Sequence, residues 1–228
     1  MKARLIRSRE IAPNTRHFEF ESEEWRTAFV PGQFLSLTAE IGGEAITRAY
    51  SIASPPDGFT FALCANLVAD GRFSPWLFSL PEGGEIDFKG PYGAFILRRP
   101  VSDSIFVATG TGIAPFRSII HAKLREHPSS RFTLIFGVRH HYGLLYHDEW
   151  LQSARELPNF DYRPTLTRPA EDWQGLTGRV QHHVIECLGP RRDVDIYICG
   201  LREMVDDLRA KLKGIGLDRK RIIYEKYD

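Results

Sequence analysis

Two different rhythms of hydrophobic and polar positions divide the 228-residue chain. Up to about residue 100, short runs of alternating apolar and polar residues are separated by turns rich in Gly and Pro. Such runs, repeated about every 8–12 residues, are typical of an antiparallel barrel or sandwich. The pattern predicts strands over 15–20, 33–38, 46–52, 59–65 and 85–88, and one helix over 74–80.

Beyond residue 100, apolar runs that suit buried strands alternate with segments whose apolar residues recur at helical spacing. This alternation indicates a doubly wound parallel α/β sheet. We therefore predict two domains, an antiparallel β-barrel over residues 1–99 and an α/β domain over residues 100–228. In the second domain the pattern predicts strands over 104–108, 132–136, 160–166, 194–198 and 222–224, and helices over 115–127, 146–156, 181–188 and 203–212.

Composition narrows the class of protein. Hydrophobic residues make up 43% and charged residues 26%, which is ordinary globular composition. With 30 basic and 29 acidic residues the net charge is +1, which disfavours nucleic acid as a partner. The N-terminal segment has no apolar core of a secretion signal, and no apolar run is long enough to span a membrane. The three cysteines, Cys64, Cys187 and Cys199, are too scattered for a disulfide framework or an iron–sulfur motif, so we expect a soluble cytoplasmic protein.

A glycine-containing loop follows the first predicted strand of the second domain. It consists of Thr109, Gly110, Thr111 and Gly112. Small residues there let backbone N–H groups approach a phosphate, and the following helix adds a favourable dipole. Because Pro115 stands where the dinucleotide fingerprint has its third glycine, an ordinary strand-to-helix turn remains the alternative.

Two segments of the first domain carry residues that suit a flat phosphorylated ligand. Arg48 and Tyr50 share one face of a predicted strand and could hold a phosphate and a ring, while the hydroxyl of Ser51 could hold a polar ring atom. An edge strand with a solvated cation accounts for this segment equally well. The segment 70–74 opens the predicted helix, where free N–H groups could take a second phosphate with Ser74 as the cap. A simple capped helix is the alternative there.

The histidines form two clusters in the second domain: His140, His141 and His147, and then His182 and His183. Adjacent histidines point to different faces, and no carboxylate stands at the spacing of a helical zinc motif. We therefore expect solvated or helix-capping histidines and no metal site.

Taken together, seven motifs make the chain recognisable. It resembles the ferredoxin–NADP(H) reductase superfamily over nearly its whole length. The motifs are RAYS at 48–51, DGRFS at 70–74, GPYGAF at 90–95, TGTGIAP at 109–115, FGVR at 136–139, YICG at 197–200 and YEKY at 224–227. The resemblance implies a flavin-binding barrel that holds FAD, followed by a domain that binds NAD(P)H.

The resemblance also implies roles for individual residues. In the barrel, Arg48 would pair with the flavin pyrophosphate, Tyr50 would stack on the isoalloxazine, and Ser51 would hydrogen-bond flavin N5. The implied flavin contacts are Arg48, Ala49, Tyr50, Ser51, Gly71, Arg72 and Ser74. In the second domain, Cys199 would lie beside the reacting nicotinamide carbon, although a small buried hydrophobic role is its ordinary alternative. The implied nicotinamide-cofactor contacts are Thr109, Gly110, Thr111, Gly112, Arg139, Cys199 and Gly200.

Three residues bear on the choice between NADP(H) and NAD(H): Thr167, Arg168 and Arg179. NADP-using relatives carry a hydroxyl–arginine pair and a later arginine that bind the 2′-phosphate, and guanidinium groups suit that dianion. Glu171 and Asp172 lie between the arginines and weigh toward NADH. The balance favours NADP(H) over NAD(H).

The C-terminus resembles that of plant-type members, which have a glutamate two residues before a final tyrosine. Glu225 and Tyr227 fit this spacing and, with Ser51 and Cys199, complete the expected catalytic set. This chain departs from the pattern by carrying Asp228 after the tyrosine, so a plain strand end is the alternative.

The resemblance implies hydride transfer from NAD(P)H to FAD, followed by release of single electrons to a ferredoxin or flavodoxin, which would be a separate partner of this expected monomer. The reductase component of an oxygenase belongs to this prediction. One alternative is a reductase of free flavin or ferric chelates. Another is a non-catalytic flavin-binding subunit of a larger complex; its dihydroorotate-dehydrogenase type carries a C-terminal cysteine cluster that this sequence lacks.

Overall fold

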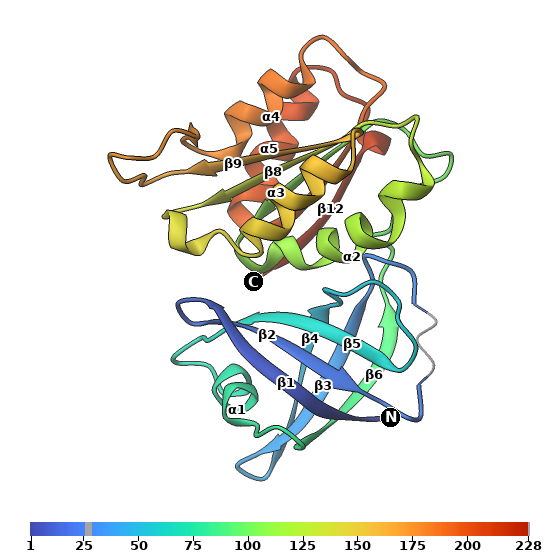
Figure 1. Cartoon of the computed structure of the whole chain (residues 1–228), viewed down its shortest axis with the longest axis vertical. Helices are drawn as coiled ribbons and strands as arrows, with labels where there is room; N and C mark the ends of the chain where they lie inside the picture. Colours follow the sequence, from blue (N-terminus) through green and yellow to red (C-terminus); the bar gives the residue numbers. More distant parts are fainter. Residues whose placement is uncertain (26–28, 228) are drawn as a thin grey trace. The chain divides into compact units, whose positions relative to one another are not determined.

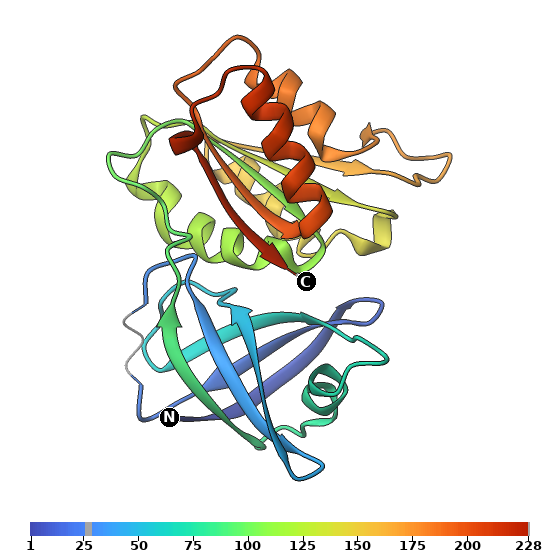
Figure 2. The ribbon, with the colours of Figure 1, turned by 180° about the vertical axis from the view of Figure 1, so that it is seen from behind.

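The computed structural model describes residues 1–25 and 29–227. The chain forms two compact units, and their boundary does not follow a single point in the sequence. Residues 1–96 and 114–122 make the first unit, and residues 97–113 with the chain from Lys123 onward make the second. Figures 1 and 2 show that each unit has its own sheet.

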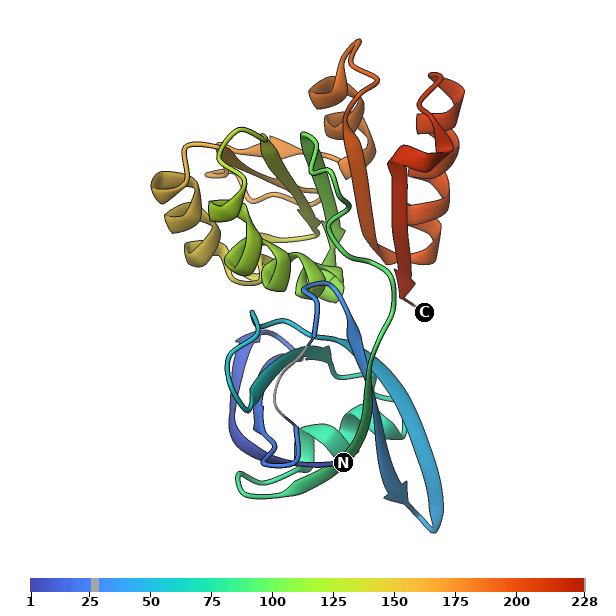
Figure 3. The same ribbon diagram turned by 90° about the vertical axis from the view of Figure 1, so that its right-hand side faces the viewer.

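The first unit is a six-stranded antiparallel barrel with the strand order β4-β3-β6-β1-β2-β5. A bridge between Ile52 and Leu63 brings the end of β4 beside β5 and so closes the barrel, which Figure 3 shows from its side. This confirms the predicted barrel. Its elements are β1 (Lys2–Ala12), β2 (Thr15–Glu21), β3 (Phe34–Ile41), β4 (Glu44–Ser51), β5 (Thr60–Asn66), α1 (Phe73–Ser79) and β6 (Glu85–Tyr92).

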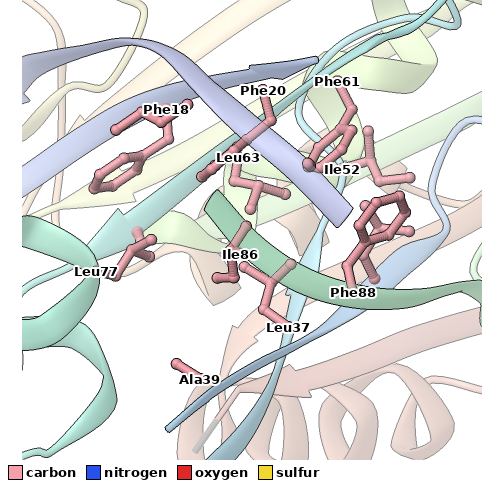
Figure 4. Packing of buried hydrophobic residues seen from close by; sticks show 14 of the residues in the cluster. Phe18, Phe20, Leu37, Ala39, Ile52, Phe61, Leu63, Leu77, Ile86 and Phe88 are labelled. Atoms are coloured by element: carbon pink, nitrogen blue, oxygen red, sulfur yellow. The ribbon is translucent and has the colours of Figure 1, made fainter. Parts of the chain in front are cut away.

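Aromatic rings fill the barrel, because alternate residues of each strand point inward. Phe18 and Phe20 of β2 are fully buried, and the rings of Phe20 and Phe61 stack at 5.4 Å. Trp25 meets Phe61 and Phe88 edge-on, each at 5.5 Å. Figure 4 shows Phe18, Phe20, Phe61 and Phe88 among the packed core side chains. Burying each such side chain contributes about 1.5–3 kcal/mol, so the core fixes the strands that carry the candidate site.

β1 was not among the predicted strands. Its side chains do alternate, since Ala3 and Leu5 are buried whereas Lys2 and Arg4 are exposed. The exposed residues make ion pairs with Glu85 and Glu21 of the neighbouring strands. The many charged residues on the outer face of β1 mask this alternation in the sequence.

The second unit is a parallel sheet of six strands in the order β10-β9-β8-β7-β11-β12. Helix α3 covers one face of the sheet (Figure 1), and α4 and α5 cover the other (Figure 2). This confirms the predicted doubly wound α/β fold; within the described part of this unit, the two-residue strand β10 and the short 3-10 helices were not predicted. The elements are β7 (Ser104–Thr109), β8 (Phe132–Val138), α3 (His147–Glu156), β9 (Phe160–Leu166), β10 (Leu176–Thr177), α4 (Val180–Leu188), β11 (Asp195–Leu201), α5 (Arg202–Gly214) and β12 (Ile222–Tyr227).

Helix α2 (Ala114–Lys123) follows β7 in sequence, and the sequence pattern assigned it to the second domain. Most of it clusters with the first unit instead. The ring of Phe116 packs edge-on against Phe95 at 5.5 Å, and Nη1 of Arg117 donates a hydrogen bond to the carbonyl of Ala53 at 2.7 Å. These side-chain contacts, which a periodic pattern does not encode, decide where the helix packs.

Among the described residues, no helix has both the length and the apolar character needed to cross a membrane.

Candidate functional site

Strand β4 presents the first group of predicted flavin contacts, Arg48, Ala49, Tyr50 and Ser51. Arg48 is exposed, and its Nη1 donates to the carbonyl of Thr47 at 2.8 Å. Tyr50 is half-buried, and burial raises the pKa of its phenol to about 12. It therefore offers a flat, uncharged ring at physiological pH. Ser51 is buried, with 5% of its surface exposed.

The second group of predicted flavin contacts lies in the loop that enters α1. The Ser74 hydroxyl accepts a hydrogen bond from the Val68 backbone N–H at 2.9 Å, and the Gly71 N–H donates to the Val68 carbonyl at 2.9 Å. The prediction that Ser74 caps the helix is wrong, because α1 begins at Phe73 and Arg72 occupies the capping position without a side-chain bond. Ser74 instead lies inside the helix and closes the loop that precedes it.

The structure brings these two groups together. The ring of Tyr50 lies 5.9 Å from that of Phe73, with 33° between the ring planes. Arg72 binds the β3–β4 hairpin, since its Nη2 donates to the Ile41 carbonyl at 2.7 Å and its Nη1 pairs with the Glu44 carboxylate. The guanidinium of Arg72 therefore holds the start of α1 beside β4.

In the second unit, the loop after β7 runs directly against β11. A Cβ atom on Gly112 would lie 2.4 Å from the Cys199 carbonyl oxygen, and a Cβ on Gly200 would lie 2.3 Å from Oγ1 of Thr109. Gly200 has a φ of +148°, in the region that favours glycine. Only glycine allows this approach of the two turns. The strand order reverses here, with β8 on one side of β7 and β11 on the other, which is where ligands bind in open α/β sheets.

This loop also holds an unsatisfied polar atom. Oγ1 of Thr109 is buried and has no hydrogen-bond partner among the described residues. Such groups are rare in folded proteins, and a bound ligand is one of the partners that can satisfy them. The orphaned hydroxyl and the cradle at Gly112 fit a nicotinamide dinucleotide.

Cys199 lies inside β11 and is fully buried, so the expectation that it stands just after the strand end is wrong. The strand continues because it pairs in parallel with β12, which sets Cys199 opposite Glu225 and Leu201 opposite Tyr227. Burial, and then the Glu225 carboxylate, raise the pKa of the Cys199 thiol well above its usual value, while a hydrogen bond with Tyr227 acts in the opposite direction. The thiol is therefore protonated at physiological pH. Asp228 lies outside the described residues.

Three exposed arginines gather at the carboxyl edge of the same sheet: Arg139 after β8, Arg168 after β9 and Arg179 before α4. The Arg168 N–H donates to the Arg139 carbonyl at 2.8 Å, and the Gly178 N–H donates to the Leu166 carbonyl at 2.8 Å. The backbone thus aligns the three segments and places Thr167 among them. None of the three guanidinium groups makes an ion pair or hydrogen bond within the described part of the chain.

Two of the clustered histidines contact polar atoms of the protein. Nδ1 of His147 lies 3.1 Å from the Tyr162 hydroxyl, and Nε2 of His183 lies 2.9 Å from the Thr177 carbonyl oxygen. Over residues 1–25 and 29–227, no group of three or more His, Cys, Asp or Glu side chains could hold a metal ion.

Two protein families and several relatives match this chain. The family of oxidoreductase FAD-binding domains matches residues 2–96, and the family of oxidoreductase NAD-binding domains matches residues 106–210. The chain is 37% identical over 238 residues to ferredoxin–NADP reductase B of Sorangium cellulosum (strain So ce56), covering 100% of this chain and 97% of that protein. It is 29% identical to the toluate 1,2-dioxygenase electron transfer component of Pseudomonas putida, with 88% of this chain covered, but spans only 59% of that relative.

Among solved structures, one neighbour is a ferredoxin NADP+ reductase from Neisseria gonorrhoeae with bound FAD and NADP. The TM-score is 0.86 and the identity 27%, over 99% of this chain and 98% of that one. Fold, site and matches together define a two-domain flavoprotein oxidoreductase that uses a nicotinamide dinucleotide. The chain belongs to the ferredoxin–NADP(H) reductase superfamily, as its motifs predicted, and is an FAD-dependent NAD(P)H reductase.

Proposed function

We propose that this chain is an NADPH-preferring reductase that passes electrons one at a time to a ferredoxin or flavodoxin. The observation that carries the NADPH preference is the set of three exposed guanidinium groups, on Arg139, Arg168 and Arg179, at neighbouring strand ends. Guanidinium groups suit a phosphate dianion because they donate paired hydrogen bonds in a planar fork. The exposed carboxylates of Glu171 and Asp172 make no ion pair with these arginines among the described residues.

The size of the preference follows from the chemistry of the contacts. A hydrogen bond to a charged group is worth about 1.5–3 kcal/mol, which is roughly a 10- to 100-fold change in affinity. NADH has no 2′-phosphate and would leave the exposed guanidinium groups in water, with no gain and little penalty. Two of the arginines are therefore enough to make NADPH the preferred donor.

In the first unit, the residues on β4 and α1 suit the flavin. When bound, FAD supplies the chemistry that accepts a hydride pair and releases electrons singly. The neutral ring of Tyr50 offers a stacking surface, Arg48 offers a cation for the pyrophosphate, and the Ser51 hydroxyl offers a hydrogen bond to the reacting ring. Gly71, Arg72 and Ser74 hold the loop whose backbone N–H groups would bind the second phosphate group.

In the second unit, the residues around the β7 loop suit the nicotinamide dinucleotide. Gly110, Thr111 and Gly112 offer backbone N–H groups, and the orphaned Thr109 hydroxyl is ready to hydrogen-bond a ligand. The protonated thiol of Cys199 offers a small apolar surface beside Gly200, and Glu225 is the adjacent group able to hold a proton. Tyr227 hydrogen-bonds the thiol and would have to move for a ring to reach it.

The names of the relatives support a ferredoxin as the electron acceptor. Two proteins that this chain spans at 97% and 98% of their length are called ferredoxin–NADP reductases. Oxygenase components, such as the toluate dioxygenase component, support the narrower role of an oxygenase reductase. Because this chain spans 59% of that relative, the oxygenase role is the second candidate. The proposal keeps the expected monomer and cytoplasmic location.

The test is a double variant, Arg168→Ala with Arg179→Ala. We expect the KM for NADPH to rise about 100-fold or more, since two charge-assisted contacts are lost, while the KM for NADH changes little. Steady-state rates with both nicotinamides, each against ferredoxin, flavodoxin and free riboflavin, measure the preference and the acceptor together.

The matched control is Arg192→Ala with Arg219→Ala, which removes the same charge from segments that precede β11 and β12 at the opposite edge of the sheet. Those changes should leave both KM values near those of the parent protein. A parent protein that prefers NADH would refute the cofactor proposal, and one that reduces only free riboflavin would refute the acceptor proposal.

A further inference from the structure

The indole of Trp173 lies where the three arginine-bearing segments of the second unit meet. We propose that Trp173 is a positioning residue that sets the selectivity for the 2′-phosphate, by holding the loop between Arg168 and Arg179 in its open form. This inference rests on the NADPH preference proposed above and adds to it a residue that carries no charge.

Trp173 ties both halves of that loop together. Its backbone N–H donates to the Ala170 carbonyl at 3.1 Å, and its indole Nε1 donates to the Leu176 carbonyl at 2.9 Å. The indole also lies against Gly175, where a Cβ atom would stand 2.3 Å from Cζ2 of the ring. A side chain at position 175 would push the ring away, so the glycine and the indole form one unit.

The same ring connects the loop to the segment after β8. Its centroid lies 5.6 Å from that of His141, which follows Arg139 by two residues. His141 in turn meets His147 edge-on at 5.5 Å, and Nδ1 of His147 lies 3.1 Å from the hydroxyl of Tyr162 on β9. A row of rings therefore anchors the loop to both neighbouring strands.

The hydrogen bonds at the strand ends fix only the two ends of the loop. The Thr165 hydroxyl donates to the Gly178 carbonyl at 2.9 Å, which fixes the far end of the loop close to Arg179. The exposed acidic pair, Glu171 and Asp172, lies between the two fixed ends, directly before Trp173. Without the indole contacts, this pair is free to swing toward Arg168 and Arg179.

A collapsed loop would weaken phosphate binding in two ways. An exposed carboxylate–guanidinium pair is worth up to about 1 kcal/mol, and a phosphate would have to displace it. The arginines would also lose their arrangement around a single dianion, and displacement of binding groups by about 1 Å can already cost large factors. Both effects act on ligands with a 2′-phosphate and leave ligands without one unaffected.

The experiment compares two probes that differ only in that phosphate, adenosine 2′,5′-bisphosphate and adenosine 5′-monophosphate, by calorimetric titration of the flavin-loaded protein. We expect Trp173→Ala to weaken the bisphosphate about tenfold, equivalent to about 1.4 kcal/mol, and to change the monophosphate less than about twofold. The KM for NADPH should rise in parallel, with kcat unchanged with either nicotinamide.

Three further variants separate positioning from general damage. Trp173→Phe keeps a ring against His141 but removes the indole hydrogen bond to the Leu176 carbonyl, so it should restore part of the discrimination. His141→Ala removes the same contact from the other side and should reproduce the loss. Tyr142→Ala removes the adjacent exposed ring, which stacks on His140 at 5.1 Å, and should leave the ratio of the two affinities as in the parent protein.

The two probes distinguish a failure of the NADPH proposal from a failure of the Trp173 proposal. If the parent protein binds both probes equally, the proposed NADPH preference fails. If the parent protein discriminates and both Trp173→Ala and His141→Ala keep its ratio, the positioning role of Trp173 is refuted. An equal loss of affinity for both probes also refutes the positioning role, since that result indicates general loosening of the site. Should Trp173→Ala fail to fold, His141→Ala decides the question.

Discussion

At the scale of single residues, two glycines allow the loop after β7 to pack against β11. Gly112 and Gly200 allow the turn after β7 and the end of β11 to approach more closely than any side chain permits. Thr109 Oγ1 is buried by the same approach and left without a partner in the described structure. Close packing and an unsatisfied hydroxyl thus arise from one feature, the contact between two strand ends.

Gly112→Ala tests this contact. The added methyl group meets backbone atoms, which cannot rotate away, so we expect a loss of about 1–3 kcal/mol in the free energy of unfolding. The KM for both nicotinamides should rise as the loop shifts. Denaturant unfolding and nicotinamide titration measure the two effects.

Gly214→Ala is the control for that prediction. Gly214 ends helix α5, and a Cβ there would meet nothing within 4 Å. Replacement of an unconstrained helical glycine by alanine stabilises by about 0.4–1 kcal/mol. Equal destabilisation of the two variants would show that the close approach at Gly112 is not what matters.

At the scale of elements, the short helix α1 is held from both ends of its entry loop. The buried Ser74 hydroxyl bonds to the Val68 N–H, and Arg72 reaches the β3–β4 hairpin. Both contacts fix a loop that would otherwise be loose. If the proposed flavin site is correct, α1 therefore contributes to it through the loop at its start.

Ser74→Ala tests the role of that entrance. It removes the acceptor of the Val68 N–H in a partly buried hydrogen bond, and the loss of such a bond costs about 0.5–1.5 kcal/mol. We also expect faster loss of FAD on gel filtration, because the loop proposed to bind a flavin phosphate becomes mobile. Bound FAD per chain, measured by absorbance, checks this.

Ser79→Ala provides the comparison within the same helix. The Ser79 hydroxyl is exposed and donates to the Trp76 carbonyl at 2.8 Å, so its loss should be nearly neutral for both stability and FAD retention. If Ser74→Ala behaves like Ser79→Ala, the entry loop does not depend on the buried hydroxyl.

At the scale of the whole molecule, buried protonated groups set the response to pH. Burial raises the pKa of Tyr50 and Tyr197 to about 12, and raises the pKa of Tyr162 and of the Cys199 thiol as well. Burial lowers the pKa of His147 below its usual 6.5. By contrast, Glu126, Glu156 and Asp206 have lowered pKa values but are exposed, so they add little.

The signs of these shifts predict a stability maximum between about pH 7 and 9. Above that range the unfolded chain releases thiol and phenol protons that the folded chain retains, so the free energy of unfolding falls as the pH rises. Below about pH 6.5 the unfolded chain binds a proton on His147 that the folded chain does not bind. The free energy of unfolding therefore falls again, by a smaller amount.

Melting temperatures over the range from about pH 5 to 11 check this prediction, together with tyrosinate absorbance. The buried tyrosines should ionise only as the circular dichroism signal is lost. Ionisation of all eight tyrosines near pH 10 in a protein that keeps its native signal would contradict it.

Much of the fold follows from local pattern. The strand predicted over 160–166 matches β9 (Phe160–Leu166) at both ends, because its flanking turns are marked in the sequence. β1 and β10 were missed for different reasons. Charges on the outer face obscured the alternation of β1, and the two residues of β10 form a strand only because β9 lies beside them.

The sequence by itself determined the order of the two folds and the family, since each depends on residues close together in the chain; the segments that it assigns to cofactor binding stay a prediction. Only the tertiary structure decided that α2 packs with the barrel, that Cys199 lies within a strand against Glu225, and that Trp173 joins three arginine segments. Those facts depend on which distant side chains meet across strands and loops, and such long-range contacts leave no periodic trace in the sequence.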